Sequence, residues 1–167
     1  MAGLICSLLP SFAVASYASA PSRSLAFYNT HTGETLKTVY WEKGFYIVDS
    51  LREVNHVLRD HRTNEAKAMD TDLLDLLYVL HQRIESGKPF EIISGYRSPK
   101  SNMQLHEHSN GVAFKSLHME GKAIDIRLQD RPLKNLRAMA MQLQQGGVGY
   151  YPGSDFVHVD TGAVRYW

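Results

Sequence analysis

The chain has 167 residues, of which 44% are hydrophobic and 21% are charged, and its 18 basic side chains nearly balance 17 acidic ones. A disordered chain would carry fewer hydrophobic residues or a large net charge, so this composition indicates a globular protein of about one domain. The net charge of +1, with no concentrated basic run, argues against a protein that neutralises nucleic-acid phosphates. We therefore expect a compact domain without a nucleic-acid partner.

The first twenty residues differ from the rest of the chain because they carry no charge. They contain an apolar stretch and end in Ala18-Ser19-Ala20, the small-x-small pattern of a cleavage site. A proline and two serines interrupt the stretch, so it falls short of the roughly 20 apolar residues that span a bilayer. We predict that residues 1–20 are a secretory signal peptide, whose basic start is trimmed or lies upstream, and that residues 21–167 form the mature domain without a stable membrane anchor. The alternative is a buried N-terminal helix.

Cys6 is the only cysteine, and cleavage after Ala20 removes it. The mature chain then has neither a disulfide nor a thiol nucleophile, and a metal site would have to use histidines and carboxylates. A cysteine-free exported chain fits the periplasm. Export by the twin-arginine route stays open, because its motif would lie in the missing basic region.

Residue patterning predicts a single domain of mixed secondary structure. Runs rich in aromatic and β-branched residues predict strands, and apolar residues at three- and four-residue spacing predict helices. In chain order we expect strands at 25–29 and 35–41 joined by a hairpin turn, a helix at 48–58, a helix from a cap at Asp70 or Thr71 to the break at Gly87, a strand at 90–94, a short helix opening at Ser98-Pro99, a strand at 123–128, a helix at 132–144, and strands at 148–151, 156–159 and 163–167. Because strands and helices do not alternate regularly, the order favours an α+β fold over a doubly wound one.

Three residues with the chemistry of metal ligands lie in the second half of the chain. His118 and Asp125 are seven residues apart with Gly121 between them, and His158 follows in a predicted strand. Two imidazole nitrogens and one carboxylate oxygen suit Zn²⁺ and leave its fourth position for water. Spacing alone also allows an ordinary hydrogen-bonded His–Asp pair.

The pattern around these residues resembles a known family. Ser-x-His-x-x-Gly-x-Ala-x-Asp at 116–125, followed by Asp-x-x-His at 155–158, is similar to the M15-type zinc peptidases, the D-Ala-D-Ala carboxypeptidases and L,D-endopeptidases that cleave bacterial cell-wall peptides. The segments at 31–34, 94–98, 146–152 and 156–162 look like the murein endopeptidases of that family. The resemblance covers residues 25–167. It implies a hedgehog/DD-peptidase-like fold, a small and mostly antiparallel sheet with flanking helices.

Carried over position by position, the resemblance implies that His118, Asp125 and His158 hold one zinc ion that polarises water toward hydroxide. Arg97, in the Ser-Gly-Tyr-Arg segment, would hydrogen-bond the scissile carbonyl as it becomes an oxyanion, or grip a substrate carboxylate. The alternative for Arg97 is an ion pair with Glu91 or Asp125 that braces the loop.

The reaction also needs a carboxylate that passes a proton to the leaving amine. Asp155 lies three residues before His158, where the wider family keeps its base, and we prefer it. Asp160, two residues after His158, shares the histidine's face of a strand and is the rival, as base or as a partner that orients the imidazole. Asp155 is otherwise a simple turn residue.

A further pair, His106 and His108, has the look of metal ligands, but the turn composition of the adjoining Ser109-Asn110-Gly111 favours a solvated loop.

Together these observations predict an exported, periplasmic zinc endopeptidase that hydrolyses peptidoglycan cross-links, with stem peptides as its partners and a monomeric state assumed. Two alternatives stay open: a D,D-carboxypeptidase that trims terminal D-Ala, and a zinc-stabilised cell-wall binding module without turnover. The sequence leaves open whether an L,D bond between two diaminopimelate residues or a D,D bond from D-Ala to diaminopimelate is cut. The resemblance implies tolerance of both, with the L,D bond favoured.

Overall fold

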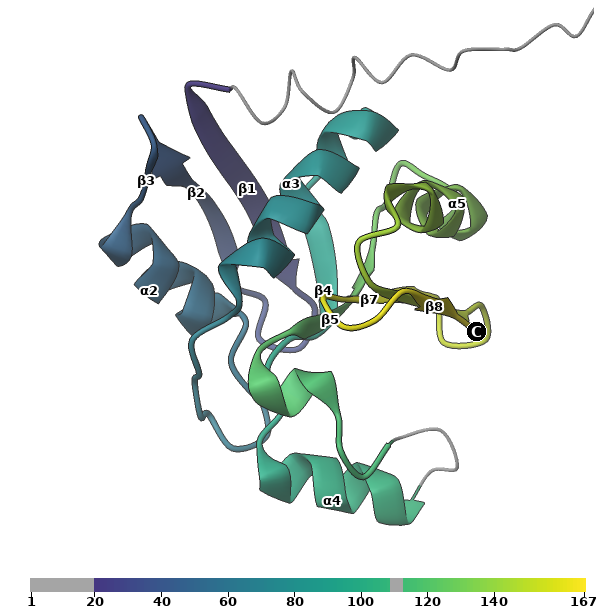
Figure 1. Cartoon of the computed structure of the whole chain (residues 1–167). Coiled ribbons are helices and arrows are strands. Elements are labelled where there is room, and N and C mark those ends of the chain that lie inside the picture. The colour runs from purple at the N-terminus through teal and green to yellow at the C-terminus, as the bar shows by residue number, and fades with distance from the viewer. Residues whose placement is uncertain (1–19, 109–112) are drawn as a thin grey trace, which may run out of the picture.

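A computed structural model describes residues 20–108 and 113–167 of the chain (Figure 1). The predicted signal peptide lies outside the described residues except for its last position. In chain order the elements are β1 (Ser22–Asn29), β2 (Thr35–Glu42), β3 (Phe45–Tyr46), α2 (Val48–Val57), α3 (Thr71–Ile84), β4 (Phe90–Ser94), α4 (Pro99–His108), the 3₁₀ helix η1 (Leu117–Glu120), β5 (Ala123–Arg127), α5 (Leu133–Leu143), β6 (Gly147–Tyr151), β7 (Phe156–Asp160) and β8 (Arg165–Tyr166).

The strands of the described residues form one sheet in the order β3-β2-β1-β4-β5-β7-β6-β8. The pairs β1/β4 and β6/β8 are parallel, and every other neighbouring pair is antiparallel. The sheet is therefore mixed but mostly antiparallel, and the predicted α+β class is confirmed. The parallel pairs arise because α2 and α3 separate β1 from β4 in the chain, and because residues 161–164 bring the chain back from β7 to the free edge of β6.

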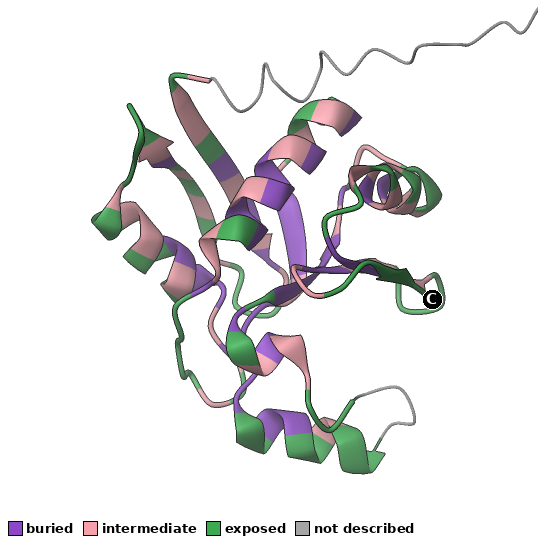
Figure 2. Ribbon diagram, viewed as in Figure 1, coloured by how far each residue is buried: buried purple, intermediate pink, exposed green. Residues whose placement is uncertain are grey.

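The core lies between the sheet and the helices α2, α3 and α5, which bury residues such as Val54, Leu74 and Leu136. The carboxylate of Asp70 caps α3 by accepting a hydrogen bond from the Asp72 amide at 3.0 Å, which satisfies one of the free amides of the first turn. The helix then buries its leucine stripe, Leu73, Leu74, Leu76, Leu77 and Leu80. In Figure 2 the buried residues gather on β4 and on one side of α3. In Figure 1, η1 and α4 lie below β5, and α3 and α5 lie above it.

Two predicted boundaries are corrected by the structure. The segment 106–108, expected as a loop, forms the last turn of α4, which begins with Pro99 at its first position. The predicted strand at 163–167 is shorter and comprises only Arg165–Tyr166. The two-residue strand β3 was not expected, because so short a run has no periodicity to detect.

In the part of the chain that the structure describes, no helix combines the length and the apolar character that crossing a bilayer requires.

Candidate metal centre

Neighbouring strands place two of the candidate ligands opposite each other. Asp125 in β5 and His158 in β7 are partners in the antiparallel register, so their side chains leave the same face of the sheet. His118 arrives from η1, whose first turn is capped by Ser116 through a hydrogen bond from the His118 amide to the serine Oγ at 3.3 Å. Gly121 ends η1 at φ +73°, where a Cβ would lie 2.4 Å from the Ala68 carbonyl oxygen. Only glycine lets the chain turn there from His118 into β5.

The three side chains converge. Nδ1 of His158 lies 2.9 Å from Oδ1 of Asp125, Nε2 of His118 lies 3.3 Å from the same oxygen, and the two imidazole nitrogens are 3.2 Å apart. Ligands at about 2.05 Å from a tetrahedral zinc ion are roughly 3.3 Å from one another, so these atoms need shifts of only tenths of an ångström to bind it. All three residues are nearly buried, and their donor set fits Zn²⁺.

Hydrogen bonds on the far side of each imidazole fix which nitrogen faces the centre. Nδ1 of His118 donates to the Gly95 carbonyl at 2.8 Å, which leaves the Nε2 lone pair directed at the site. Nε2 of His158 donates to Oδ2 of Asp160 at 2.9 Å, which leaves Nδ1 directed at it. Such outer hydrogen bonds orient metal-binding histidines and raise their basicity.

Asp160 is completely buried and its oxygens are fully engaged. Besides His158, it accepts hydrogen bonds from the backbone amides of Gly147 at 3.0 Å and Gly162 at 2.8 Å, and from both terminal nitrogens of Arg165 at 3.0 and 2.7 Å. This carboxylate therefore faces away from the centre. Of the two roles left open for it by the sequence, the geometry matches the orienting one.

The charges of the centre are strongly coupled in the metal-free protein. Burial alone would raise the pKa of Asp125, but the adjacent His118 and His158 hold that pKa well below its usual range. Burial lowers the pKa of His158, yet the carboxylates of Asp125 and Asp160 outweigh it and raise the pKa to about 9. The carboxylates of Asp125 and Asp160 thus favour a positive charge between them.

Arg97 lies beside the centre with long, loose contacts. Its Nη2 is 3.7 Å from Oδ2 of Asp125 and 3.4 Å from the Ser94 hydroxyl, and Nη1 is 3.3 Å from Oδ1 of Asn102. Its Nε is buried and has no hydrogen-bond partner among the described residues. Glu91, the other partner considered for Arg97, pairs with Arg127 instead. The guanidinium therefore retains hydrogen-bonding capacity next to the metal ligands.

Asp155 sits elsewhere. It lies in the turn between β6 and β7 at φ +54°, and its carboxylate bonds to Nη1 of Arg127 at 3.0 Å. Its chain neighbours Ser154 and Phe156 line the cavity at the metal centre, but Asp155 lines a separate hollow beside Arg127. The structure thus brings His118, Asp125, His158 and Arg97 together and leaves Asp155 outside that group.

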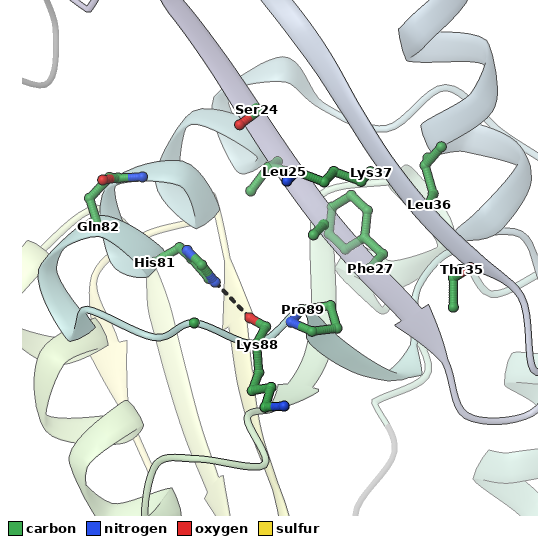
Figure 3. Close-up of a pocket in the computed structure, with 12 residues that line it drawn as sticks. Ser24, Leu25, Phe27, Thr35, Leu36, Lys37, His81, Gln82, Lys88 and Pro89 are labelled. Carbon is green, nitrogen blue, oxygen red and sulfur yellow. Dashed lines mark hydrogen bonds between the residues drawn. The ribbon is translucent and has the colours of Figure 1, made fainter.

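The centre opens into a cavity of about 350 Å³. Aromatic residues form one part of its wall, Tyr151, Phe156 and Trp167, and basic residues form another, Arg97, Lys115 and Arg165. A larger cavity of about 480 Å³ lies between β1, β2 and the end of α3, and Figure 3 shows His81 bonded there to the Lys88 carbonyl. The candidate ligands His118, Asp125 and His158 line the smaller cavity.

Sequence reasoning did not identify three residues that shape the site. Asp60 accepts hydrogen bonds from the amides of Ser98 and Arg62 at 2.8 and 2.9 Å and thereby holds the loop that carries Arg97. Arg165 and Trp167 follow β7 and fold back over the cavity. Nothing in their spacing marks them, because their placement depends on β8 pairing with β6.

Two imidazoles and a carboxylate that converge at a cavity, with a guanidinium beside them, form a candidate site for a metal ion that activates water. The chain belongs to the M15 peptidase family described as peptidoglycan L,D-endopeptidase MepK, whose sequence profile matches residues 17–167. The resemblance to the murein endopeptidases of the M15-type family, noted from the motifs, is thus confirmed.

Individual relatives agree with the profile. The chain is 42% identical over 160 residues to the peptidoglycan L,D-endopeptidase MepK of Escherichia coli K12, an alignment that covers 96% of this chain and 88% of that protein. It is 40% identical over 163 residues to the probable peptidoglycan L,D-endopeptidase MepK of Haemophilus influenzae, covering 96% and 87% of the two chains.

Proposed function

We propose that this protein is a zinc-dependent endopeptidase that hydrolyses peptide cross-links of peptidoglycan, with the L,D cross-link as its main substrate. The observation that carries the proposal is the convergence of His118, Asp125 and His158 in a chain whose relatives are named peptidoglycan L,D-endopeptidases. The same relatives favour an endopeptidase over a carboxypeptidase or a binding module.

Zinc held by these three residues would polarise both water and the scissile carbonyl, which supplies a nucleophile near neutral pH. The protein's own part is to fix the geometry. Gly95 and Asp160 hold His118 and His158 in the orientation that metal binding needs, so neither imidazole has to turn when the metal binds. The nearly complete burial of Asp125 strengthens its interaction with a cation.

Arg97 is proposed to donate a hydrogen bond to the scissile carbonyl oxygen as negative charge develops there. Its contacts to Ser94, Asn102 and Asp125 are all 3.3 Å or longer, so they hold the guanidinium in place without using its full capacity. One preorganised donor of this kind contributes about 3 kcal/mol to the transition state.

For the base we propose Asp155, on the strength of its position three residues before His158. Asp160 is a poor candidate, because its two oxygens already accept hydrogen bonds from His158, Arg165 and two backbone amides. For Asp155 to act, its carboxylate has to leave Arg127 and turn toward the cavity that Ser154 and Phe156 line.

Residues 1–20 are proposed to direct export to the periplasm, where the substrate lies, and to be removed there. The N-terminal sequencing of the protein recovered from that compartment tests this directly. A mature chain that begins at Pro21 is expected, and a retained Met1 would contradict it.

The activity is tested with purified muropeptide dimers, one set joined by L,D bonds and one by D,D bonds, digested by the mature protein and followed by mass spectrometry. We expect the L,D dimers to become monomers faster than the D,D dimers. The variant His118→Ala, which removes one ligand, is the matched control and should leave both dimers intact. Loss of a single D-Ala from an intact dimer would instead identify a carboxypeptidase, and binding without cleavage would identify a binding module.

A further inference from the structure

Trp167 lines the cavity at the candidate metal centre, and two hydrogen bonds hold its main chain. Its amide donates to the Val148 carbonyl at 3.2 Å, and its carbonyl accepts from the Tyr150 amide at 3.0 Å. These bonds continue the pairing of β8 with β6 by one residue beyond the strand. The main chain that carries the indole is therefore held by the sheet.

The ring itself is also held. Its Nε1 donates to the Tyr151 hydroxyl at 2.7 Å, and the guanidinium of Arg165 lies 5.0 Å from the ring centroid. A Cβ at Gly149 would lie 2.7–2.8 Å from three indole atoms, so the ring occupies space that only glycine leaves open. With its one polar atom paired, the remainder of the indole is an apolar surface.

That surface faces the metal centre. The indole centroid lies 5.3 Å from the imidazole of His158, and Trp167 lines the same cavity as His118 and Asp125. The residue as a whole nevertheless remains 46% exposed. A large apolar residue that is rigidly held and left half exposed beside a reactive centre has the features of a binding surface.

We propose that Trp167 is a substrate-contacting, specificity-determining residue, whose exposed indole face receives the aliphatic side chain of the residue adjoining the scissile amide. The inference rests on the proposed function, because diaminopimelate, the residue beside either kind of cross-link, joins an aliphatic chain to a carboxylate. The cavity matches both parts, with Trp167, Tyr151 and Phe156 for the chain and the basic side chain of Lys115 for the carboxylate.

Steady-state kinetics on L,D-linked muropeptide dimers test the contact. Trp167→Ala should raise KM about tenfold while kcat and zinc affinity stay within about threefold of wild type, and Trp167→Phe should restore much of the KM. Tyr166→Ala is the matched control, since Tyr166 is the adjacent aromatic residue, is 40% exposed and does not line the cavity. It should behave as wild type.

Fluorescence gives a second readout that does not depend on turnover. Trp41 is the only other tryptophan, so the zinc-loaded variant Trp41→Phe reports on Trp167 alone. Rapid mixing with L,D dimers should change its emission before monomers appear. If this change is absent while dimers are cleaved, or if Trp167→Ala leaves KM unchanged, the proposed contact between Trp167 and the substrate is refuted. A loss of zinc affinity in step with activity would also overturn it, because Trp167 would then act only by packing on His158.

The same two readouts separate this inference from the proposed function. If the wild-type protein binds zinc but cleaves no dimer, the endopeptidase assignment fails, and the emission of Trp167 on mixing with dimer still decides the contact. A change in emission supports it, and an unchanged emission at saturating dimer refutes it.

Discussion

The carboxylate of Asp160 bonds to Nε2 of His158, and the carboxylate of Asp125 faces Nδ1 of the same ring, each at 2.9 Å. His158 is thus held between an inner carboxylate that would share the metal and an outer one that sets the direction of its lone pair. Mutation of Asp125 would remove a candidate metal ligand, whereas mutation of Asp160 would remove only the group that orients His158.

Asp160→Asn should lower zinc affinity about 10- to 100-fold, because the amide cannot replace the charged acceptor for both His158 and Arg165. Competition with a chromogenic chelator measures this affinity. Glu120→Gln, a change to an exposed carboxylate that pairs with Lys122, is the control and should leave it unaltered. An unchanged affinity in Asp160→Asn together with a large fall in kcat would instead assign Asp160 the role of base.

Asp155→Asn should keep its zinc and lose about 100-fold in kcat if this carboxylate passes the proton. Arg127→Ala, which frees the Asp155 carboxylate, should retain kcat. We expect this variant to fold, because Glu91 keeps its hydrogen bond from Gln129, and its melting temperature checks this. A kcat for Asp155→Asn within about threefold of wild type would limit Asp155 to its ion pair with Arg127.

Arg97→Ala should lose about 100- to 1,000-fold in kcat and bind zinc as well as wild type, because the guanidinium contacts the centre only through a 3.7 Å approach to Asp125. Arg97→Lys keeps the charge but not the fork of donors, and should recover little. Loss of zinc from Arg97→Ala would show that the residue braces the loop and the ligands instead.

Zinc affinity should increase with pH up to about 9. In the metal-free protein burial lowers the pKa of His158, but Asp125 and Asp160 raise it to about 9, so below that pH a proton occupies the ligand and must leave when zinc binds. Calorimetry in buffers of different ionisation enthalpy counts the protons released. No release at pH 7 would contradict the protonated state of His158.

Asp60 couples stability to the position of Arg97. Burial would raise its pKa, but hydrogen bonds, including those from the amides of Ser98 and Arg62, lower it from 3.8 to about 2. Because the pKa of Asp60 is lower in the folded protein than in the unfolded chain, ionised Asp60 stabilises the fold. This contribution to stability is present above about pH 4 and is lost as the pH falls through about 2.

Asp60→Asn should destabilise the protein by about 1–3 kcal/mol, because one buried amide loses its acceptor, and should lower kcat through the displaced loop. Asp49→Asn is the control for stability, since that carboxylate is 87% exposed and should cost less than about 0.5 kcal/mol. Denaturant titration measures both. Equal stability of the two variants would exclude a structural role for Asp60.

The sequence was sufficient for much of the fold because its signals are local. The leucine stripe and Asp70 cap predicted α3, and the run at 90–94 predicted β4. The candidate metal ligands were predicted from spacing and resemblance, and the structure explains the spacing of the first two: Gly121 turns the chain from His118 toward the strand that carries Asp125.

What the sequence did not reveal depends on contacts between distant residues. The parallel pairing of β1 with β4 joins two segments that β2, β3, α2 and α3 separate in the chain, and no periodicity encodes it. The hydrogen bond between Asp155 and Arg127 joins residues 28 positions apart, and the one between Asp60 and Ser98 joins residues 38 positions apart. Arg165 and Trp167 reach the cavity only because β8 adds to the sheet beside β6.

Titration of the metal-free protein with zinc, followed by the rate at which it converts L,D-linked muropeptide dimers to monomers, tests the central claim most directly. The account predicts that activity rises linearly to an end point at one zinc per chain and that His118→Ala shows no such rise. Cleavage of dimers by the fully chelated protein, or binding of one zinc per chain without cleavage, would contradict it.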